Sequence, residues 1–359
     1  MYFYQVLSAD VMFKVPGKRK LLAQVLHTSG VYDLARLWPE STLSVFNFHR
    51  IRADNHSTEY DETVYGPHVD VFRKHMTWLA KNADAVSEGD LISHIKNGTP
   101  LPKRGFMITF DDGYRDNFDL AKPVLNDLKI PGFFFVPTLA INERVLGWWD
   151  DIWYLLKKTN KKTFQFRGET IDNTQPVSFV SELFTLKMKH LSAAASETLV
   201  YDLSEACEVD LPTREQSDRE FMTWDQLREA DRSGITIGSH THTHRVLATL
   251  DLETQRQELA LSSSILEKEL GKKPKSFAYP VGGYEHFNSE TVSMTQECGY
   301  DLAFSFLTGV NRAGSIQAGD IKRVDFQQSE PIYEGVISMP WVFGKRTCAL
   351  PATQSKSSS

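Results

Sequence analysis

Short apolar runs alternate with amphipathic stretches along most of the chain. The apolar runs predict strands at 43–48, 105–110, 132–137, 235–238, 276–279, 301–305 and 321–326. Apolar residues at helical spacing predict helices over 69–83, 90–96, 116–128, 148–157, 223–232, 251–270 and 287–298. Strands that alternate with helices in this way indicate βα units, and therefore an α/β fold with a parallel sheet.

Two terminal segments and one internal segment depart from this alternation. Residues 141–220 are treated as an inserted region, because 160–220 are more polar and carry no clear parallel-strand pattern. We expect residues 1–42 to form a helical extension, since apolar positions recur among basic residues there. A basic amphipathic helix can pack on its own domain or make a peripheral contact with a membrane. Residues 346–359 are expected to be a disordered tail, which leaves 43–345 for the main domain.

The composition fits a folded protein with a large core. Of the 359 residues, 41% are hydrophobic, which excludes a disordered chain and allows either two domains or one barrel. The net charge of −6 argues against nucleic acid as a partner, because phosphate binding needs a concentrated basic surface. Three cysteines fit neither a disulfide framework nor a zinc ribbon. Without a recognisable signal peptide or transmembrane span we expect a cytoplasmic protein, and its oligomeric state stays open.

Two carboxylates follow the strand predicted at 105–110. Asp111 and Asp112 precede Gly113, and adjacent carboxylates after an apolar strand are costly unless they are paired, ligated or hydrated. A turn at Gly113 can aim both into one pocket, where one binds a cation and the other accepts a proton. Active sites of parallel α/β folds lie at the carboxyl ends of strands, which favours a catalytic role. A plain Asp-Asp-Gly turn is the alternative.

Three histidines follow the strand predicted at 235–238. His240 and His244 have the i, i+4 spacing that puts two ligands on one face of a helical turn, where they can share a metal. In that case His242 faces away. In an extended segment all three side chains share a face, and His242 becomes a possible ligand. The whole chain has 11 histidines, so three within 240–244 rarely arise by chance.

Together the two clusters supply two imidazoles and one carboxylate, with a second carboxylate to spare. Three protein ligands and an open position are typical of a catalytic Zn²⁺ site and also suit Co²⁺, Mn²⁺ or Ni²⁺. The spare carboxylate can deprotonate a water that the metal has acidified, so the set predicts metal-assisted hydrolysis. After the strand predicted at 276–279, Pro280 and two glycines form a turn in which the Val281 N–H can donate to a developing oxyanion.

These residues resemble the polysaccharide deacetylase superfamily, carbohydrate esterase family 4. ITFDDGYRDN at 108–117 is similar to its first motif, SHTHTH at 239–244 to its second, and SFAYPVGGY at 276–284 loosely to its third. Further similar segments stand in the expected order, so the resemblance covers most of 43–326. It implies an α/β fold, a distorted (β/α)₇ barrel, here with an N-terminal helical extension and an inserted region.

The resemblance also implies roles for individual residues. Asp112, His240 and His244 match the metal ligands of the family, and Asp111 matches its general base. The N–H of Val281 matches the oxyanion donor that follows the proline of the third motif. The implied activity is hydrolysis of acetyl groups on amino sugars, with a divalent metal as the cofactor and a glycan that contains N-acetylated sugar as the partner.

Two positions depart from the family pattern. Many members carry an arginine two residues before the proline of the third motif, where this chain has Ala278. Arg323, at the end of a late strand, is the candidate substitute, and a structural arginine is the alternative. Many members also use a late Leu-x-His histidine as the general acid, but here no histidine follows His286. His49, at the end of the first predicted strand, is the candidate acid, with a structural histidine as the alternative.

Three hypotheses for function follow. The first is metal-dependent removal of the N-acetyl group from an N-acetylhexosamine in a poly- or oligosaccharide. The second keeps the metal site but acts on an O-acetyl ester or a cyclic amide, and the third is a barrel that binds glycan without turnover.

Trp148, Trp149 and Trp153 form either a sugar-stacking platform or a buried helix face. We expect the insertion to cover one rim of the barrel and to set substrate choice.

Overall fold

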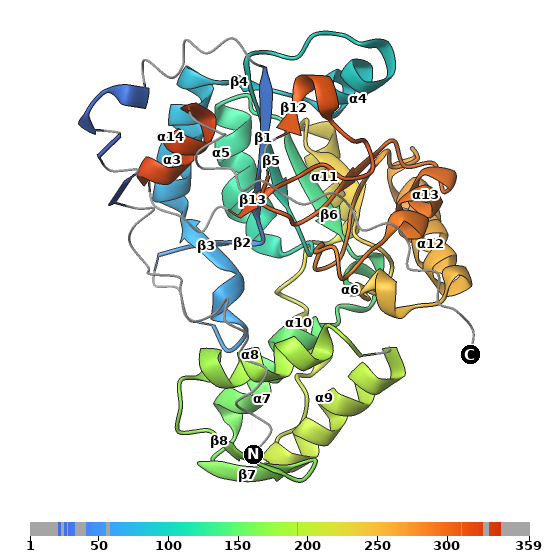
Figure 1. The fold of residues 1–359 in the computed structure, drawn as a ribbon. Helices are drawn as coiled ribbons and strands as arrows, with labels where there is room; N and C mark the ends of the chain where they lie inside the picture. The colour runs from blue at the N-terminus through green and yellow to red at the C-terminus, as the bar shows by residue number, and fades with distance from the viewer. Residues whose placement is uncertain are drawn as a thin grey trace, which may run out of the picture.

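The strands predicted from the apolar runs form one curled, mostly parallel sheet (Figure 1). The computed structural model describes residues 21–22, 25–26, 28–32, 41–54, 58–191, 193–309, 311–325 and 330–338. The strand order along the sheet is β11 (Leu302–Phe304), β10 (Ser276–Ala278), β9 (Thr236–Ser239), β6 (Gly132–Val136), β5 (Arg104–Phe110), β1 (Thr42–Phe48) and β12 (Asn311–Arg312). Neighbours in this order are parallel, except that β12 is antiparallel to β1.

The last predicted strand joins the two edges of this sheet. Ile321 forms a parallel bridge with Phe304 of β11, and β13 (Val324–Asp325) pairs in parallel with β1, with Val324 opposite Phe46. The sheet therefore closes as a distorted α/β barrel, and the predicted fold class is confirmed. The short strands β12 and β4 (Asp84–Ala85) pair with the amino ends of β1 and β5.

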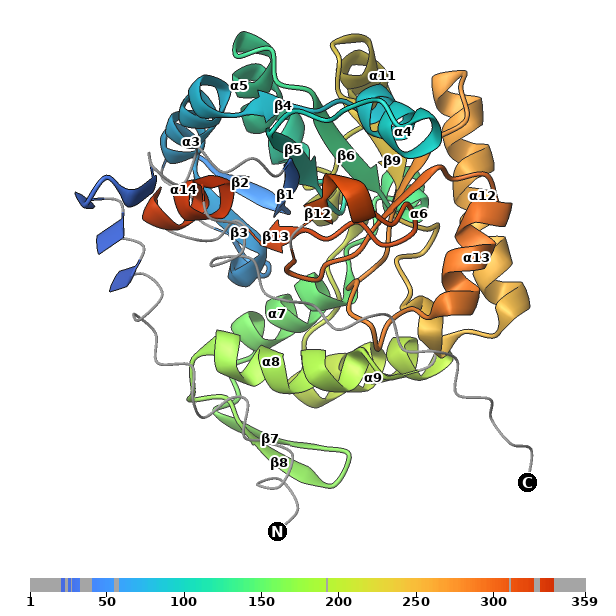
Figure 2. The ribbon, with the colours of Figure 1, turned by 45° about the horizontal axis from the view of Figure 1, so that its top comes forward.

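Helices cover the outside of the barrel (Figure 2). They are α3 (Val69–Asn82), α4 (Glu88–Asn97), α5 (Lys122–Asp127), α11 (Trp224–Arg232), α12 (Leu252–Leu270) and α13 (Ser289–Glu297). Because helices and loops cover the outer face and side chains fill the interior, β1 and β6 are buried along their full length. This double burial is the reason that the strands are near-continuous apolar runs in the sequence.

The helix expected over 116–128 begins in a different way. Residues 117–121 are π-helical before α5, and the carboxylate of Asp116 accepts hydrogen bonds from Arg50 Nε and the Ile51 N–H, each 2.7 Å long. Several short elements were not predicted. They are β2 (Arg50–Arg52), β3 (Tyr65–His68), α6 (Thr138–Glu143), α14 (Glu330–Ser338) and the 3₁₀ turns Glu62–Val64, Leu247–Thr249 and Ala313–Ser315.

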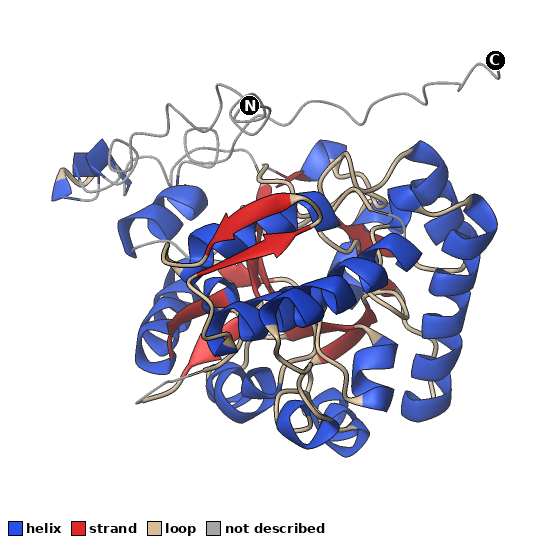
Figure 3. Cartoon of the chain, turned by 90° about the horizontal axis from the view of Figure 1, so that it is seen from below, coloured by secondary structure: helices blue, strands red, loops and turns tan. Residues whose placement is uncertain are grey.

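The insertion folds as a layer of its own against the barrel. It contains α7 (Trp148–Lys158), the hairpin of β7 (Thr163–Phe166) and β8 (Glu169–Asp172), α8 (Val177–Met188), α9 (Ala193–Cys207) and α10 (Arg214–Ser217). Figure 3 looks at the molecule from this side, with the helices and hairpin of the insertion in front of the barrel. Ile152, Phe166, Phe184 and Leu203 belong to an apolar cluster distinct from the barrel clusters, and Leu146 packs against both this cluster and the main barrel cluster.

Little of the predicted terminal segments is described. In the N-terminal extension Tyr32 is 3% exposed and belongs to the main barrel cluster, and Leu26 packs against that cluster. This part of the extension therefore packs on its own domain. The tail predicted over 346–359 lies outside the described residues. Within the described ranges, no helix is both long enough and apolar enough to cross a membrane.

Candidate active site

Asp111 and Asp112 lie just beyond the carboxyl end of β5. Positive φ angles at Asp112 (73°) and Gly113 (74°) turn the chain sharply after the strand. Both carboxylates line one cavity, and each residue is only 3% exposed. Two adjacent buried carboxylates destabilise a fold unless each has a compensating partner. The two residues have different partners, and the difference divides their possible roles.

His240 and His244 face Asp112 from the loop after β9. Asp112 Oδ1 lies 3.6 Å from His240 Nε2 and 3.3 Å from His244 Nε2. The loop is neither the helical turn nor the extended segment considered from the sequence, because Thr241 (65°) and His244 (57°) have positive φ angles. Neither of the two local geometries left open by the sequence is therefore formed. The two rings still meet, with centroids 4.7 Å apart.

His242 lies apart from this cluster. Its Nδ1 is 2.8 Å from Thr138 Oγ1, and its side chain is not among the potential ligands that converge. Glu258 of α12 holds the loop from behind, since its carboxylate accepts the backbone N–H groups of His242 (3.0 Å) and Thr243 (2.8 Å). Sequence reasoning missed Glu258. The available signal was an acidic residue on the apolar face of the helix predicted over 251–270.

The donor set of Asp112, His240 and His244 fits a divalent metal. Their potential ligand atoms all lie within 4.8 Å of one another. Ligands placed tetrahedrally about 2.0–2.1 Å from Zn²⁺ stand about 3.3–3.4 Å apart, close to the two distances from Asp112 Oδ1. That oxygen is buried and has no well-oriented hydrogen bond from the described residues. His240 Nδ1 lies 2.8 Å from the Ala278 carbonyl oxygen, so this ring donates there and keeps Nε2 free as a ligand.

Asp111 is compensated by an arginine instead. Arg323 Nη1 donates to Asp111 Oδ1 and to Asn47 Oδ1, both over 2.8 Å, and Asn47 Nδ2 donates to Asp111 Oδ2 over 3.2 Å. Burial favours a raised pKa for Asp111, but the Arg323 guanidinium and then the His240 ring outweigh it, so the pKa lies below its usual value. Asp111 is therefore ionised and held in one orientation, which suits a general base.

Arg323 reaches this carboxylate from the closing strand of the barrel. Its side chain is fully buried, and its Nε donates to the Ser305 carbonyl oxygen over 2.9 Å. The structure thus brings together Asp111 and the arginine considered as a substitute for the one absent at Ala278. Sequence reasoning missed Asn47, a polar residue inside the apolar run at 43–48. Its side chain links Asp111, Arg323 and Thr109, whose Oγ1 donates to Asn47 Oδ1 over 2.6 Å.

Val281 lines the same cavity from the loop after β10. Its φ angle is 60°, which is rare for a β-branched residue, and Gly282 follows with 67°. A side chain at Gly282 would put Cβ 2.5 Å from the backbone nitrogen of Phe306, so this turn requires glycine. No hydrogen bond joins the Val281 N–H to the described part of the chain. The N–H is therefore available to an acceptor in the cavity.

His49 lines the cavity from the end of β1. Its ring meets Phe306 edge to face, with centroids 5.7 Å apart, and its carbonyl oxygen accepts Asn117 Nδ2 over 2.8 Å. The next residue, Arg50, stacks between Tyr65 and Tyr114, with its guanidinium carbon 4.4 and 4.2 Å from their ring centroids.

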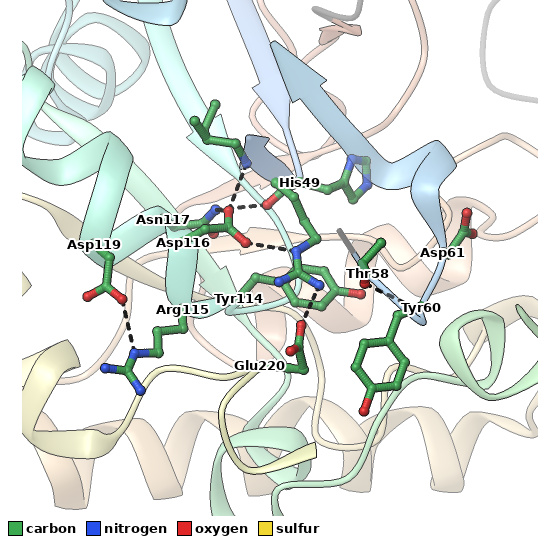
Figure 4. A network of polar contacts seen from close by, with 12 residues as sticks. His49, Thr58, Tyr60, Asp61, Tyr114, Arg115, Asp116, Asn117, Asp119 and Glu220 are labelled. Atoms are coloured by element: carbon green, nitrogen blue, oxygen red, sulfur yellow. Dashed lines mark hydrogen bonds and ion pairs between the residues drawn. The ribbon is translucent and has the colours of Figure 1, made fainter. Parts of the chain in front are cut away.

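The same guanidinium pairs with Asp116 and Glu220, two carboxylates that are labelled in Figure 4. Arg50 Nε lies 2.7 Å from Asp116, and Nη1 lies 2.7 Å from Glu220 at the far end of the insertion. The side chains of Arg50, Asp116 and Glu220 are all largely buried, so water does not readily replace either carboxylate as a partner of the guanidinium. The network therefore fixes the backbone that carries His49.

The cavity itself has a volume of about 290 Å³ and two kinds of wall. Barrel loops contribute the residues described above, whereas the insertion contributes Trp148, Trp149, Thr185 and Lys189. The Trp149 ring packs against His244, with centroids 4.6 Å apart. The insertion therefore borders the candidate metal ligands directly.

The three tryptophans considered as a sugar platform separate into two groups. Trp148 and Trp149 line the cavity, whereas Trp153 is 4% exposed and does not line it. Trp149 Nε1 donates to Tyr114 Oη over 2.8 Å, and Tyr114 Oη donates to Asp150 over 2.7 Å. This chain of hydrogen bonds ties the helix α7 of the insertion to the loop that carries Asp111 and Asp112.

Comparisons with known proteins place these motifs in a family. The family model described as polysaccharide deacetylase matches residues 98–303. YxkH of Bacillus subtilis (strain 168), whose name refers to the same family, is 31% identical over 232 residues, which are 64% of this chain and 55% of the relative. The poly-β-1,6-N-acetyl-D-glucosamine N-deacetylase of Escherichia coli (strain K12) is 24% identical over 310 residues, which are 78% of this chain and 36% of the relative. The chain thus spans about half or less of these curated relatives.

Solved structures show the same fold. The Streptococcus pyogenes deacetylase PplD has a TM-score of 0.54 at 16% identity, and the match covers 81% of this chain and 96% of that one. IcaB from Ammonifex degensii has a TM-score of 0.51 at 18% identity, and the match covers 85% of this chain and 98% of that one.

Proposed function

The chain belongs to the polysaccharide deacetylase family, and we propose that it hydrolyses the N-acetyl group of an N-acetylhexosamine within a glycan, releasing acetate and a free amine. One observation carries this proposal. Asp112, His240 and His244 converge as a metal-ligand set, while Asp111 beside them is held by Arg323 and is not needed as a ligand. A pure binding site would not require this second ionised carboxylate.

Asp112, His240 and His244 would hold the metal, which we propose to be Zn²⁺, with Co²⁺, Mn²⁺ or Ni²⁺ as alternatives that the same donors accept. When bound, the ion supplies Lewis acidity to the amide carbonyl and to the attacking water. The other steps depend on groups of the chain itself.

Asp111 accepts the proton of the attacking water. Its carboxylate is ionised before reaction because Arg323 opposes the effect of burial on its pKa. Arg323 and Asn47 each donate to one oxygen of the carboxylate and so fix its plane in the wall of the cavity, without a conformational search. General base catalysis of this kind contributes about 10²–10⁴-fold to a rate.

Val281 and His49 serve the later steps. As water adds to the acetamide carbon, negative charge develops on the carbonyl oxygen, and the free N–H of Val281 donates to it. The C–N bond then breaks, and the leaving nitrogen takes a proton from the His49 side chain. Both groups line the cavity that contains Asp111.

For the substrate we propose poly-N-acetylglucosamine. The support is the Escherichia coli relative, whose name specifies the β-1,6-linked polymer and which is similar over 78% of this chain. The aromatic wall formed by Trp148 and Trp149 suits a sugar ring, whose apolar face packs well on an aromatic side chain.

Acetate release from β-1,6-linked N-acetylglucosamine oligosaccharides tests the proposal. We expect release by the protein loaded with Zn²⁺, loss of release after treatment with a chelator, and recovery when the metal is returned. An O-acetylated sugar and a cyclic amide, assayed in parallel, test the alternatives that the same site can serve. Hydrolysis of either alternative without any release from the N-acetylated oligosaccharide would overturn the proposal.

A further inference from the structure

One charged side chain of the insertion reaches the cavity that holds the candidate metal ligands. The insertion contributes Trp148, Trp149, Thr185 and Lys189 to that cavity, and Lys189 is the charged one. It also lines the neighbouring cavity along α8, so it stands where the two cavities meet. Lys189 directly follows α8. A lysine at the end of a helix usually extends into water and interacts with the helix dipole, whereas this one lines the candidate site.

The ammonium of Lys189 has no close partner in the described part of the chain. Its Nζ forms neither an ion pair nor a hydrogen bond there, and Glu182 and Glu285 act on it only from a distance. Burial outweighs both carboxylates and lowers the pKa of Lys189 below its usual value. A partly buried cation without a partner costs stability, which favours a role in the cavity over a role in packing.

The carboxylates around the same cavity are engaged by other groups. Asp111 and Asp112 have the partners described above. Asp61 accepts hydrogen bonds of 2.7 and 2.6 Å from the N–H and the hydroxyl group of the residue two positions further on. Glu182, which lines the neighbouring cavity, is exposed, so water screens its charge. An incoming group therefore meets the uncompensated positive charge of Lys189.

The proposed reaction changes the charge of the sugar in this cavity. An acetamide is neutral, whereas the amine left after hydrolysis takes up a proton at neutral pH and becomes an ammonium. We propose that Lys189 repels this ammonium, so that the cavity accepts N-acetylated sugar and rejects its own product. The proposal rests on the proposed deacetylase function and adds a specificity-determining residue to it. Coulomb repulsion acts over several ångströms, so Lys189 need not touch the reacting atoms.

Binding without turnover is the first test. The Asp111→Asn protein, loaded with Zn²⁺, is titrated by calorimetry with a β-1,6-linked glucosamine tetrasaccharide and with its N-acetylated counterpart, at about pH 6, where the amines are protonated. Adding Lys189→Met should tighten binding of the glucosamine form about 3- to 10-fold and leave the N-acetylated form unchanged. Lys189→Glu, which reverses the charge, should tighten it further, and Lys189→Arg, which keeps the charge, should change neither affinity.

An exposed lysine of the same helix provides the control for this series. Lys187 pairs with Glu169 at 3.1 Å and lines neither cavity, so Lys187→Met should leave both affinities unchanged. Sodium chloride should narrow the difference between Lys189→Met and the parent protein, because salt screens a repulsion between charges. If Lys189→Met and Lys189→Glu change neither affinity, or weaken both ligands alike, the proposal is wrong.

Inhibition of acetate release is the second test. The glucosamine tetrasaccharide is added as an inhibitor while the N-acetylated form is the substrate. The ratio of its inhibition constant to KM should fall about 3- to 10-fold in Lys189→Met and should stay at the wild-type value in Lys189→Arg. Acetate release with an unchanged ratio would overturn the role of Lys189 while the proposed function stands. If no protein of the series releases acetate, the proposed function fails, and the binding series still decides whether Lys189 selects against amines.

Discussion

The barrel and the insertion use apolar residues in different ways. A barrel strand such as β6 is buried along its full length, whereas β7 of the insertion alternates exposed and buried residues and covers the insertion with one face only. Their apolar clusters are separate, with Phe134 in the barrel and Phe184 in the insertion. The groups to which we assign the chemistry lie on barrel loops, and the insertion supplies walls of the cavity. Chemistry and substrate binding should therefore respond to different substitutions.

The largest effect is expected at the buried ion pair of the barrel. Arg323→Met keeps the length of the side chain but leaves Asp111 buried without its cation, which typically costs about 3–5 kcal/mol of unfolding free energy. Acetate release should also fall at least about 100-fold, because the base loses its orientation. Urea denaturation and an acetate assay measure the two effects. Arg256→Met, in an exposed pair with Glu297, is the control and should change neither.

A substitution in the core of the insertion should separate the two regions. Phe184 is 2% exposed, and Phe184→Ala should cost about 3–5 kcal/mol. Because the clusters are separate, we expect hydrogen exchange to accelerate in α7, α8 and α9 while the barrel strands stay protected. Zinc affinity should persist and KM for long glycans should rise. Equal acceleration in β5 and β6 would show that the two regions unfold as one unit.

A substitution behind the loop that carries the histidines should have a smaller effect, and only on metal affinity. Glu258→Gln keeps the size of the side chain but weakens charge-assisted hydrogen bonds to the N–H groups of His242 and Thr243. Zinc affinity, measured by competition with a chelator, should fall about 10- to 100-fold, as for other groups that orient metal ligands. Glu267→Gln, at an exposed position of the same helix, is the control. Unchanged affinity in Glu258→Gln would mean that the loop holds its shape without this carboxylate.

The last effect depends on pH and concerns the contact between the two regions. Burial raises the pKa of Asp150 from 3.8 to about 7, so the folded protein binds this proton more tightly than the unfolded chain does. Stability from this group is therefore complete below about pH 4 and is lost as the pH rises towards 7. The side chain in Asp150→Asn cannot ionise. The Tm of this variant minus the Tm of the wild type should therefore increase from about pH 4 to about pH 7 and stay constant at higher pH. A difference in Tm that does not vary with pH would contradict this assignment.

The barrel strands could be located from the sequence because they are buried on both faces and therefore consist of near-continuous apolar runs. The run predicted at 105–110 is β5 from Arg104 to Phe110, and the last predicted strand closes the barrel. The helices α8 and α9 were missed because both pack inside the insertion, against α7 and the short hairpin, so that neither carries a strong one-sided pattern.

The residues of the candidate site also divide into those that the sequence predicts and those that it does not. Asp111, Asp112, His240 and His244 stand in dense polar runs directly after apolar strands, where the position alone indicates chemistry. Asn47 and Glu258 are single polar residues inside apolar patterns, and their partners are distant in sequence. The orientation of His242 depends on a positive φ angle at Thr241, a conformation that a threonine does not predict.

The central claim is that Asp112 binds the metal whereas Asp111 moves the proton. Bound zinc per chain and acetate release, measured on the same samples of wild type, Asp112→Asn and Asp111→Asn, test it most directly. We expect about one zinc ion and full activity in the wild type, loss of both in Asp112→Asn, and retained zinc with activity lowered at least about 100-fold in Asp111→Asn. An Asp111→Asn protein that loses its zinc, or an Asp112→Asn protein that stays fully active, would contradict the account.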